Sequence, residues 1–162
     1  MLKIKVAIFP GRFEPITLNH LNIIGRALKL FDKIIVLVLN NPNLKPIISI
    51  PNRLKLIKLA TQELNVETDY WEHLIIDYAE IAGACAIIKT IKNSNTFEKD
   101  YDMSIATKLL KPNIETVFFP VNPKYGYINS ELILKLAIHK KNLEMMVPAA
   151  IIAKLTKILS EV

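Results

Sequence analysis

The sequence predicts one α/β domain over residues 1–162, built on a doubly wound parallel sheet of about five strands flanked by helices. Two observations lead to this prediction. Short β-branched runs alternate along the chain with segments whose apolar residues follow helical spacing, as expected when helices cover a parallel sheet. No repeat, low-complexity tract or Gly/Ser linker divides the 162 residues, a length that suits a single domain.

Five short runs are predicted to be strands. The clearest are residues 4–9, 33–39 and 115–119, which are mostly apolar and rich in valine, isoleucine and phenylalanine. Such runs are typical of strands that are buried on both faces of a sheet. Less regular runs at 66–71 and 84–88 complete the sheet.

Six helices are predicted from apolar residues that recur every three or four positions, at 20–31, 52–64, 74–81, 96–110, 130–139 and 149–159. The second helix is expected to bury a stripe that contains Leu54, Ile57 and Leu64. Gly83 is placed to end the third helix, and Pro148 to begin the last one.

The composition excludes several classes of protein. The net charge is +6, but the lysines and arginines are scattered, so we expect no nucleic-acid partner. The longest apolar runs reach about seven residues, well short of the roughly twenty that span a membrane, so we expect no membrane contact. The single cysteine, Cys85, excludes an internal disulfide and favours a reducing compartment. We therefore expect a cytoplasmic protein in which Cys85 is a small buried residue.

Ligands of such a sheet bind beyond the carboxyl ends of its strands, where the strand order reverses. The loops to consider are 10–19, 40–50, 89–95 and 120–129. The glycines are isolated from one another, at Gly11, Gly25, Gly83 and Gly126. This isolation excludes a Walker A loop, a G-x-G-x-x-G dinucleotide motif and a kinase glycine-rich loop, all of which need clustered glycines.

The loop after the first strand is the most informative segment. Gly11 is expected to provide a sharp turn there, and Pro15 to stiffen the loop. Thr17 or Asn19 can cap the following helix. His20 falls in the first turn of that helix, where backbone N–H groups and the helix dipole favour an anion. The segment is therefore predicted to bind phosphate oxygens, whereas His73 and His139 have no such context and are expected at the surface.

The same segment, GRFEPITLNH, resembles the signature of the nucleotidylyltransferase superfamily, G-x-F-D-P followed by [T/H]-x-G-H at a helix start. Further along, the resemblance narrows to phosphopantetheine adenylyltransferase and covers nearly the whole chain. The other matching segments are residues 27–36, 41–46, 77–79, 97–98, 115–118 and 127–130.

The resemblance implies a Rossmann-like enzyme that transfers AMP from ATP to 4′-phosphopantetheine, giving dephospho-coenzyme A and pyrophosphate in coenzyme A biosynthesis. It also implies a Mg²⁺ ion that accompanies the nucleotide, with no metal ligand assigned in the protein, and a homo-oligomer, usually a hexamer. In this reaction one phosphate attacks another in line, so the protein acts mainly by positioning and by neutralising charge.

The resemblance assigns a role to individual residues. The catalytic residues would be His20, Lys45 and Lys92. The ATP-binding residues would be Gly11, Phe13, Thr17, His20, Lys92, Asp100, Asn129 and Ser130. The acceptor-binding residues would be Arg12, Lys45, Leu74 and Lys89.

Several residues depart from the family's pattern, and they cluster at the site. Asn19 replaces a glycine, Leu44 replaces the first lysine of a K-K-P loop, and Glu131 replaces the last serine of I-S-S-S. Arg12 replaces a serine or threonine, and we hypothesise that its guanidinium restores the charge that Leu44 lacks. The remaining departures are Glu14 for aspartate, Lys89 and Lys92 for arginines, Thr90 for glycine, Thr107 for asparagine and Lys135 for glutamate.

Two other functions stay open at this point. A divergent member of the superfamily could transfer AMP or CMP to another phosphorylated acceptor, such as glycerol 3-phosphate or nicotinate mononucleotide. Alternatively, the protein could be a nucleotide-binding or scaffold protein with little catalytic activity, which Leu44 and Glu131 favour.

Overall fold

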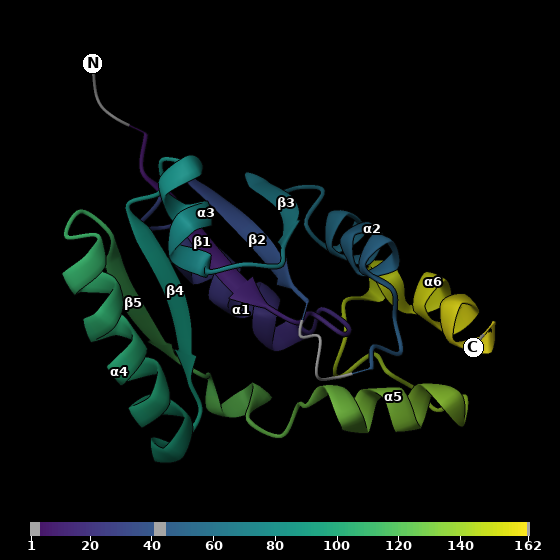
Figure 1. The fold of residues 1–162 in the computed structure, drawn as a ribbon. Helices are drawn as coiled ribbons and strands as arrows, with labels where there is room; N and C mark the ends of the chain where they lie inside the picture. The colour runs from purple at the N-terminus through teal and green to yellow at the C-terminus, as the bar shows by residue number, and fades with distance from the viewer. Residues whose placement is uncertain (1–3, 41–44, 162) are drawn as a thin grey trace.

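The structure is a computed structural model that describes residues 4–40 and 45–161, and Figure 1 shows its layers. Over these residues the chain forms a parallel five-stranded sheet in the order β3-β2-β1-β4-β5. The strands are β1 Val6–Gly11, β2 Lys33–Leu39, β3 Val66–Trp71, β4 Ala86–Ile91 and β5 Glu115–Pro120. The predicted doubly wound, Rossmann-like sheet is confirmed.

Helices cover both faces of this sheet (Figure 1). The hydrophobic layer on one face contains residues of α1 Leu18–Ala27, α2 Ile50–Ala60, α5 Ser130–Ile138 and α6 Ala149–Ser160. In this layer α6 packs against α2 and α5, and α5 lies beyond the carboxyl ends of the strands (Figure 1). The other face carries α3 Ile75–Ile81 and α4 Ser94–Leu110. A short 3₁₀ helix, Pro123–Tyr125, leads from β5 towards α5. None of the helices in the described ranges is both long enough and apolar enough to cross a membrane.

The central strand β1 contributes to two hydrophobic layers, because successive side chains of a strand point to opposite faces of the sheet. Ala7 and Phe9 pack in the layer that contains α1, α2, α5 and α6. Val6 and Ile8 pack in the opposite layer, together with residues of α3. Burial on both faces explains why the sequence of this strand is an almost continuous apolar run.

The strand order reverses between β1 and β4, and this reversal decides where a ligand can bind. From β1 the chain builds outward through β2 to β3, then returns to place β4 on the other side of β1 and continues to β5. The loops that leave β1 and β4 therefore diverge at the carboxyl edge of the sheet. Both loops belong to the set that the sequence singled out.

The predicted elements are all present, but one predicted stripe is wrong. α2 ends at Ala60, so Leu64 lies beyond the helix and is 38% exposed. The buried residues of α2 are Arg53, Leu56 and Ile57. Because the helix ends four residues earlier than predicted, Leu64 has no place on its packed face.

Predictions for three single residues had different outcomes. Gly83 follows α3 with a φ of 62°, the left-handed conformation expected of a glycine after a helix. Pro148 is the N-cap of α6, close to its predicted place. Cys85 is only partly buried, rather than buried as expected, and its Sγ lies 3.4 Å from the carbonyl oxygen of Val6.

The structure changes the reason for a glycine at the end of β1. The left-handed residue in the following loop is Phe13, with a φ of 47°, so the expectation that Gly11 provides the turn is wrong. A Cβ atom at Gly11 would lie 3.0 Å from Cε2 of Phe13. Gly11 is needed because the Phe13 ring packs directly against the backbone of β1.

This contact predicts different outcomes for two substitutions of glycine by alanine. Gly11→Ala is expected to reduce the free energy of unfolding by about 1–3 kcal/mol, because the new methyl group must displace the Phe13 ring. Gly25→Ala in α1 meets nothing within 4 Å, and the lower entropy of its unfolded chain is expected to leave stability unchanged or raised by up to about 1 kcal/mol. Urea unfolding of both variants measures the difference, and equal midpoints would contradict this role of Gly11.

Candidate functional site

The N-terminus of α1 is capped by a reciprocal pair of hydrogen bonds between Thr17 and His20. The backbone N–H of His20 donates to Oγ1 of Thr17 at 3.3 Å, and the backbone N–H of Thr17 donates to Nδ1 of His20 at 3.0 Å. The prediction that Thr17 can cap this helix is confirmed. Because Nδ1 accepts a hydrogen bond, the neutral imidazole carries its proton on Nε2.

The surroundings of His20 keep its ring neutral. The ring centroid lies 4.8 Å from that of Phe13 and 6.0 Å from that of Phe9. Burial against this apolar surface lowers the pKa of His20 to about 4. At neutral pH the residue therefore presents a neutral Nε2–H donor at a helix N-terminus, a position that favours phosphate oxygens.

A buried carboxylate joins the first loop to the segment before α2. Glu14 is 4% exposed, and its Oε1 accepts the backbone N–H groups of Ile47 at 2.6 Å and Ile48 at 2.8 Å. Its other carboxylate oxygen pairs with the guanidinium of Arg12. Both carboxylate oxygens of Glu14 thus have partners within the protein, which makes Glu14 a structural residue.

A small cavity collects charged residues near the start of α5. It has a volume of about 290 Å³, and its charged lining residues are Arg12, Glu14, Lys45 and Glu131. Ser130, the first residue of α5, lies there as well. Arg12 and Lys45, which the resemblance assigns to the acceptor, therefore lie in the same cavity as Ser130, which it assigns to ATP.

The negative charge of Glu131 in this cavity has its own partner. Oε1 of Glu131 lies 2.8 Å from Nζ of Lys135, one helical turn further along α5. This hydrogen bond and the positive charge of Lys135 lower the pKa of Glu131. Both residues depart from the family's pattern, and together they form a pair that reduces the repulsion that Glu131 alone would exert on a phosphate.

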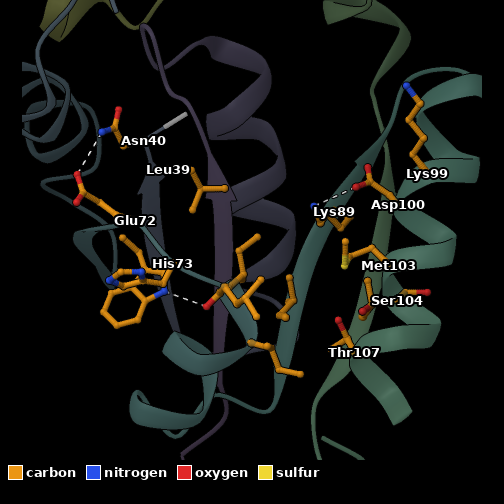
Figure 2. Close-up of a pocket in the computed structure, with 16 residues that line it drawn as sticks. Leu39, Asn40, Glu72, His73, Lys89, Lys99, Asp100, Met103, Ser104 and Thr107 are labelled. Carbon is orange, nitrogen blue, oxygen red and sulfur yellow. Dashed lines mark hydrogen bonds and ion pairs between the residues drawn. The ribbon is translucent and has the colours of Figure 1, made fainter. Parts of the chain in front are cut away.

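A larger cavity of about 520 Å³ lies between α3 and α4, above the carboxyl ends of β2 and β4 (Figure 2). Its lining is mainly apolar and includes Leu74, Ile76 and Met103. Its charged lining residues are Glu72, Lys89, Lys99 and Asp100, and Nζ of Lys89 lies 3.0 Å from Oδ1 of Asp100. The cavity is therefore mainly apolar, with the ion pair between Lys89 and Asp100 at one side.

The opposite side of this cavity is built by the segment that follows β3. The indole N–H of Trp71 donates to the carbonyl oxygen of Leu74 at 2.9 Å, which holds this segment in a turn. Asn40 donates from Nδ2 to the Glu72 carboxylate at 3.2 Å (Figure 2). His73 is exposed, as expected, but it lines the cavity and its ring lies 5.4 Å from that of Trp71.

The structure groups the predicted site residues differently from their assigned roles. Asp100, assigned to ATP, lies in the large cavity with Leu74 and Lys89, which were assigned to the acceptor. Arg12 and Lys45, also assigned to the acceptor, lie in the small cavity instead. The hypothesis about Arg12 rests on Leu44, which replaces a lysine of the family's pattern, and Leu44 lies outside the described residues.

The remaining predicted residues lie at the ends of β4 and α5. Lys92 follows β4, and its Nζ lies 3.5 Å from the carbonyl oxygen of Ile128, a weak hydrogen bond. Asn129 is the N-cap of α5, and its Oδ1 accepts the backbone N–H of Leu132 at 2.8 Å. The side chain of Asn129 is therefore occupied in capping α5, and Ser130 is left at the start of the helix.

Sequence reasoning missed one buried charge that connects these parts. Arg53 is 2% exposed and bonds to the loop after β1 and to the segment before α2. Its spacing from Leu56 and Ile57 places it on the buried stripe of α2, and this spacing was the available signal. An arginine on an apolar stripe was not recognised because arginine is seldom fully buried.

Comparisons with known proteins identify the family. The cytidylyltransferase-like family model matches residues 8–136. The chain is 44% identical over 134 residues to the phosphopantetheine adenylyltransferase of Caldanaerobacter subterraneus subsp. tengcongensis, covering 82% of this chain and 84% of that protein. It is 38% identical over 154 residues to the phosphopantetheine adenylyltransferase of Alkaliphilus metalliredigens, covering 94% and 98%. The chain belongs to the phosphopantetheine adenylyltransferase family.

Solved structures support the fold of this family member. A bifunctional NMN adenylyltransferase/ADP ribose pyrophosphatase from Francisella tularensis superposes with a TM-score of 0.74 at 17% identity. The match covers 98% of this chain and 50% of that one. At this level of identity the likeness concerns the fold alone, which agrees with the parallel sheet described above.

The state of His20 gives a prediction that needs no substrate. NMR titration of the protein is expected to show His20 with a pKa of about 4, since burial disfavours its charged form. The unfolded chain takes up this proton at 6.5, so the stability contributed by His20 is full above pH 6.5 and falls as the pH drops towards 4. A His20 midpoint at or above 6.5 would contradict the neutral donor.

Proposed function

We propose that this protein transfers AMP from ATP to 4′-phosphopantetheine, giving dephospho-coenzyme A and pyrophosphate. The observation that carries this proposal is the neutral Nε2–H of His20 at the N-terminus of α1, where the strand order of the sheet reverses. The family to which the chain belongs supports the choice of substrates.

The large cavity suits the acceptor. A 4′-phosphopantetheine molecule has a long, weakly polar arm that ends in a phosphate, and the cavity is mainly apolar with Lys89 on its lining. Lys89 would meet the acceptor phosphate, and Leu74 would contact the arm. Asp100 would hold Lys89 in place through their ion pair, which is a different role from its predicted contact with the nucleotide.

The phosphates of ATP would lie between α1 and α5. Ser130 opens α5, whose first backbone N–H groups favour an anion, and Lys92 approaches the same segment through Ile128. Arg12 and Lys45 add two positive charges in the small cavity beside Ser130. Two anionic substrates could thus approach one another without an excess of negative charge.

The chemical step is a single in-line displacement. An oxygen of the acceptor phosphate forms a bond to the α-phosphorus of ATP, the bond from that phosphorus to the bridging oxygen breaks, and pyrophosphate leaves with the electron pair. His20 would donate its Nε2–H to a non-bridging oxygen of the α-phosphate, where negative charge increases in the transition state. A neutral donor suits this role because it needs no change of protonation during the reaction.

Magnesium would accompany the nucleotide in this proposal. Within residues 4–40 and 45–161, no three His, Cys, Asp or Glu side chains are grouped so that they could hold a metal ion. We expect Mg²⁺ to be held mainly by phosphate oxygens and water, as is usual for this ion with nucleotides, and no step above depends on it. A cytoplasmic location and a homo-oligomeric, hexameric assembly also belong to the proposal.

The proposed reaction predicts pyrophosphate release that depends on both substrates. With ATP and Mg²⁺, release is expected only when 4′-phosphopantetheine is present, and His20→Ala is expected to lower kcat by about 100- to 1,000-fold, the cost of losing a transition-state donor. His139→Ala is the matched control, since His139 is an exposed residue at the end of α5, and it is expected to keep full activity.

Other results of this assay would favour the alternatives. Release with glycerol 3-phosphate or nicotinate mononucleotide, and none with 4′-phosphopantetheine, would replace the proposed acceptor. ATP binding without release for any acceptor would favour a nucleotide-binding protein without catalytic activity.

The charge of Arg12 gives a separate prediction. In this proposal the guanidinium of Arg12 binds a substrate phosphate while it also contacts Glu14. Arg12→Ser is then expected to lower kcat/KM by about 10-fold or more, because a charged hydrogen bond to phosphate contributes roughly 1.5–3 kcal/mol. Lys58→Ser on the exposed face of α2 is the control. Unchanged kinetics for Arg12→Ser would show that Arg12 binds no substrate and only pairs with Glu14.

A further inference from the structure

Arg53 is an arginine that is almost completely removed from solvent, and it contacts two separate loops. Its side chain is 2% exposed. Nε donates to the carbonyl oxygen of Ile48 at 2.7 Å, and a terminal nitrogen donates to the carbonyl oxygen of Arg12 at 3.1 Å. A buried guanidinium is costly unless it is well bonded, so the position of both carbonyl groups matters to it.

The first contact fixes the segment that carries Lys45. Arg53 bonds to the carbonyl group of Ile48, while Glu14 accepts the N–H groups of Ile47 and Ile48. Only Pro46 separates Lys45 from this doubly bonded segment, and proline restricts both its own φ and the conformation of the residue before it. The backbone of Lys45 therefore follows the position that Arg53 and Glu14 give to residues 47–48.

The second contact fixes the loop that supports His20. The carbonyl group of Arg12 belongs to the peptide that precedes Phe13, and Phe13 has a φ of 47°, which is unfavourable for a residue with a side chain. This conformation places the Phe13 ring 4.8 Å from the ring of His20. A hydrogen bond from Arg53 that holds this peptide thus also holds the apolar surface on which His20 rests.

We propose that Arg53 is a positioning residue for AMP transfer, one that holds the Lys45 segment and the Phe13–His20 contact in a fixed relative geometry. It reaches the substrates only through these residues. Glu14 is its partner in this role, because its carboxylate bonds to the same two loops. The inference rests on the proposed function for its kinetic consequences, whereas its structural consequences can be tested without substrate.

The geometry of the side chain explains why an arginine is required. The guanidinium donates from two nitrogens in a fixed plane to two carbonyl groups from different loops. A lysine would keep the positive charge, but its ammonium group is a point charge and cannot reproduce this planar pair of contacts. Arg53→Lys therefore releases one loop while it preserves charge and most of the volume.

The test is Arg53→Lys, with Lys55→Arg as the matched control at an exposed position of the same helix. Arg53→Lys is expected to lower kcat for pyrophosphate release by about 100-fold, since a misplacement of roughly 1 Å in a reacting group has an effect of this size, while a smaller change is expected in KM for ATP. Lys55→Arg is expected to match the original protein in both constants.

NMR gives a readout that does not depend on activity. In Arg53→Lys the His20 pKa is expected to rise from about 4 towards 6.5, because a loosened Phe13 covers the ring less. The amide protons of Ile47 and Ile48 are expected to exchange with solvent faster. A folded Arg53→Lys protein with the original kcat and the original His20 titration would overturn the proposal.

A second variant covers the case in which Arg53→Lys does not fold. Glu14→Gln keeps an oxygen that can accept the two backbone N–H groups. It removes the negative charge that attracts the guanidinium groups of Arg53 and Arg12. It is expected to shift kcat and the His20 pKa in the same directions by smaller amounts, and no shift in either would overturn the proposal. If the original protein releases no pyrophosphate, the proposed function fails, whereas the His20 titrations still decide the role of Arg53.

Discussion

The buried carboxylate of Glu14 is the interaction on which the rest of the site depends. A carboxylate that is 4% exposed must have its oxygens bonded, and Glu14 meets this need with the N–H groups of Ile47 and Ile48 and the guanidinium of Arg12. These partners come from two loops that leave neighbouring strands at the carboxyl edge of the sheet. One charge therefore ties the loop of His20 to the segment of Lys45, and Arg53 bonds to the same two parts of the chain.

The departures from the family's pattern are easier to understand as pairs than as separate losses. Arg12 is paired with Glu14, Glu131 with Lys135, and Lys89 with Asp100. In the second pair, the negative charge gained at Glu131 is met by the positive charge gained at Lys135. In the Arg12–Glu14 pair, Glu14 keeps the carboxylate of the family's aspartate, and the positive charge gained at Arg12 lies beside it. Loss of function through drift would leave charges near the site without partners. The pairing instead favours an enzyme whose site has been rebuilt with a different set of side chains.

The sequence predicted the order of strands and helices because that order depends on periodicity, which each segment carries by itself. It also predicted the cap at Thr17 and the place of His20 in the first turn of α1, since both are local features. It could not predict that Phe13, rather than Gly11, takes the left-handed conformation, because this depends on how a ring packs against β1. The grouping of Asp100 with Lys89 was missed for the same reason, because it depends on a contact between two segments. The burial of Arg53 could be read from its spacing in α2, but its contact with the loop after β1 could not.

In the proposed function the acceptor phosphate meets Lys89, so the ion pair between Lys89 and Asp100 would bear on how this phosphate binds in the large cavity. Before binding, Nζ of Lys89 lies 3.0 Å from Oδ1 of Asp100, so the lysine is partly neutralised. An ammonium group has three donors, and it can keep Asp100 while it bonds to a phosphate oxygen. An arginine paired in the bidentate manner with a carboxylate would have to give up part of that contact. In the proposed function, the lysine that replaces the family's arginine would therefore suit the carboxylate beside it, because it could hold Asp100 and the acceptor phosphate together.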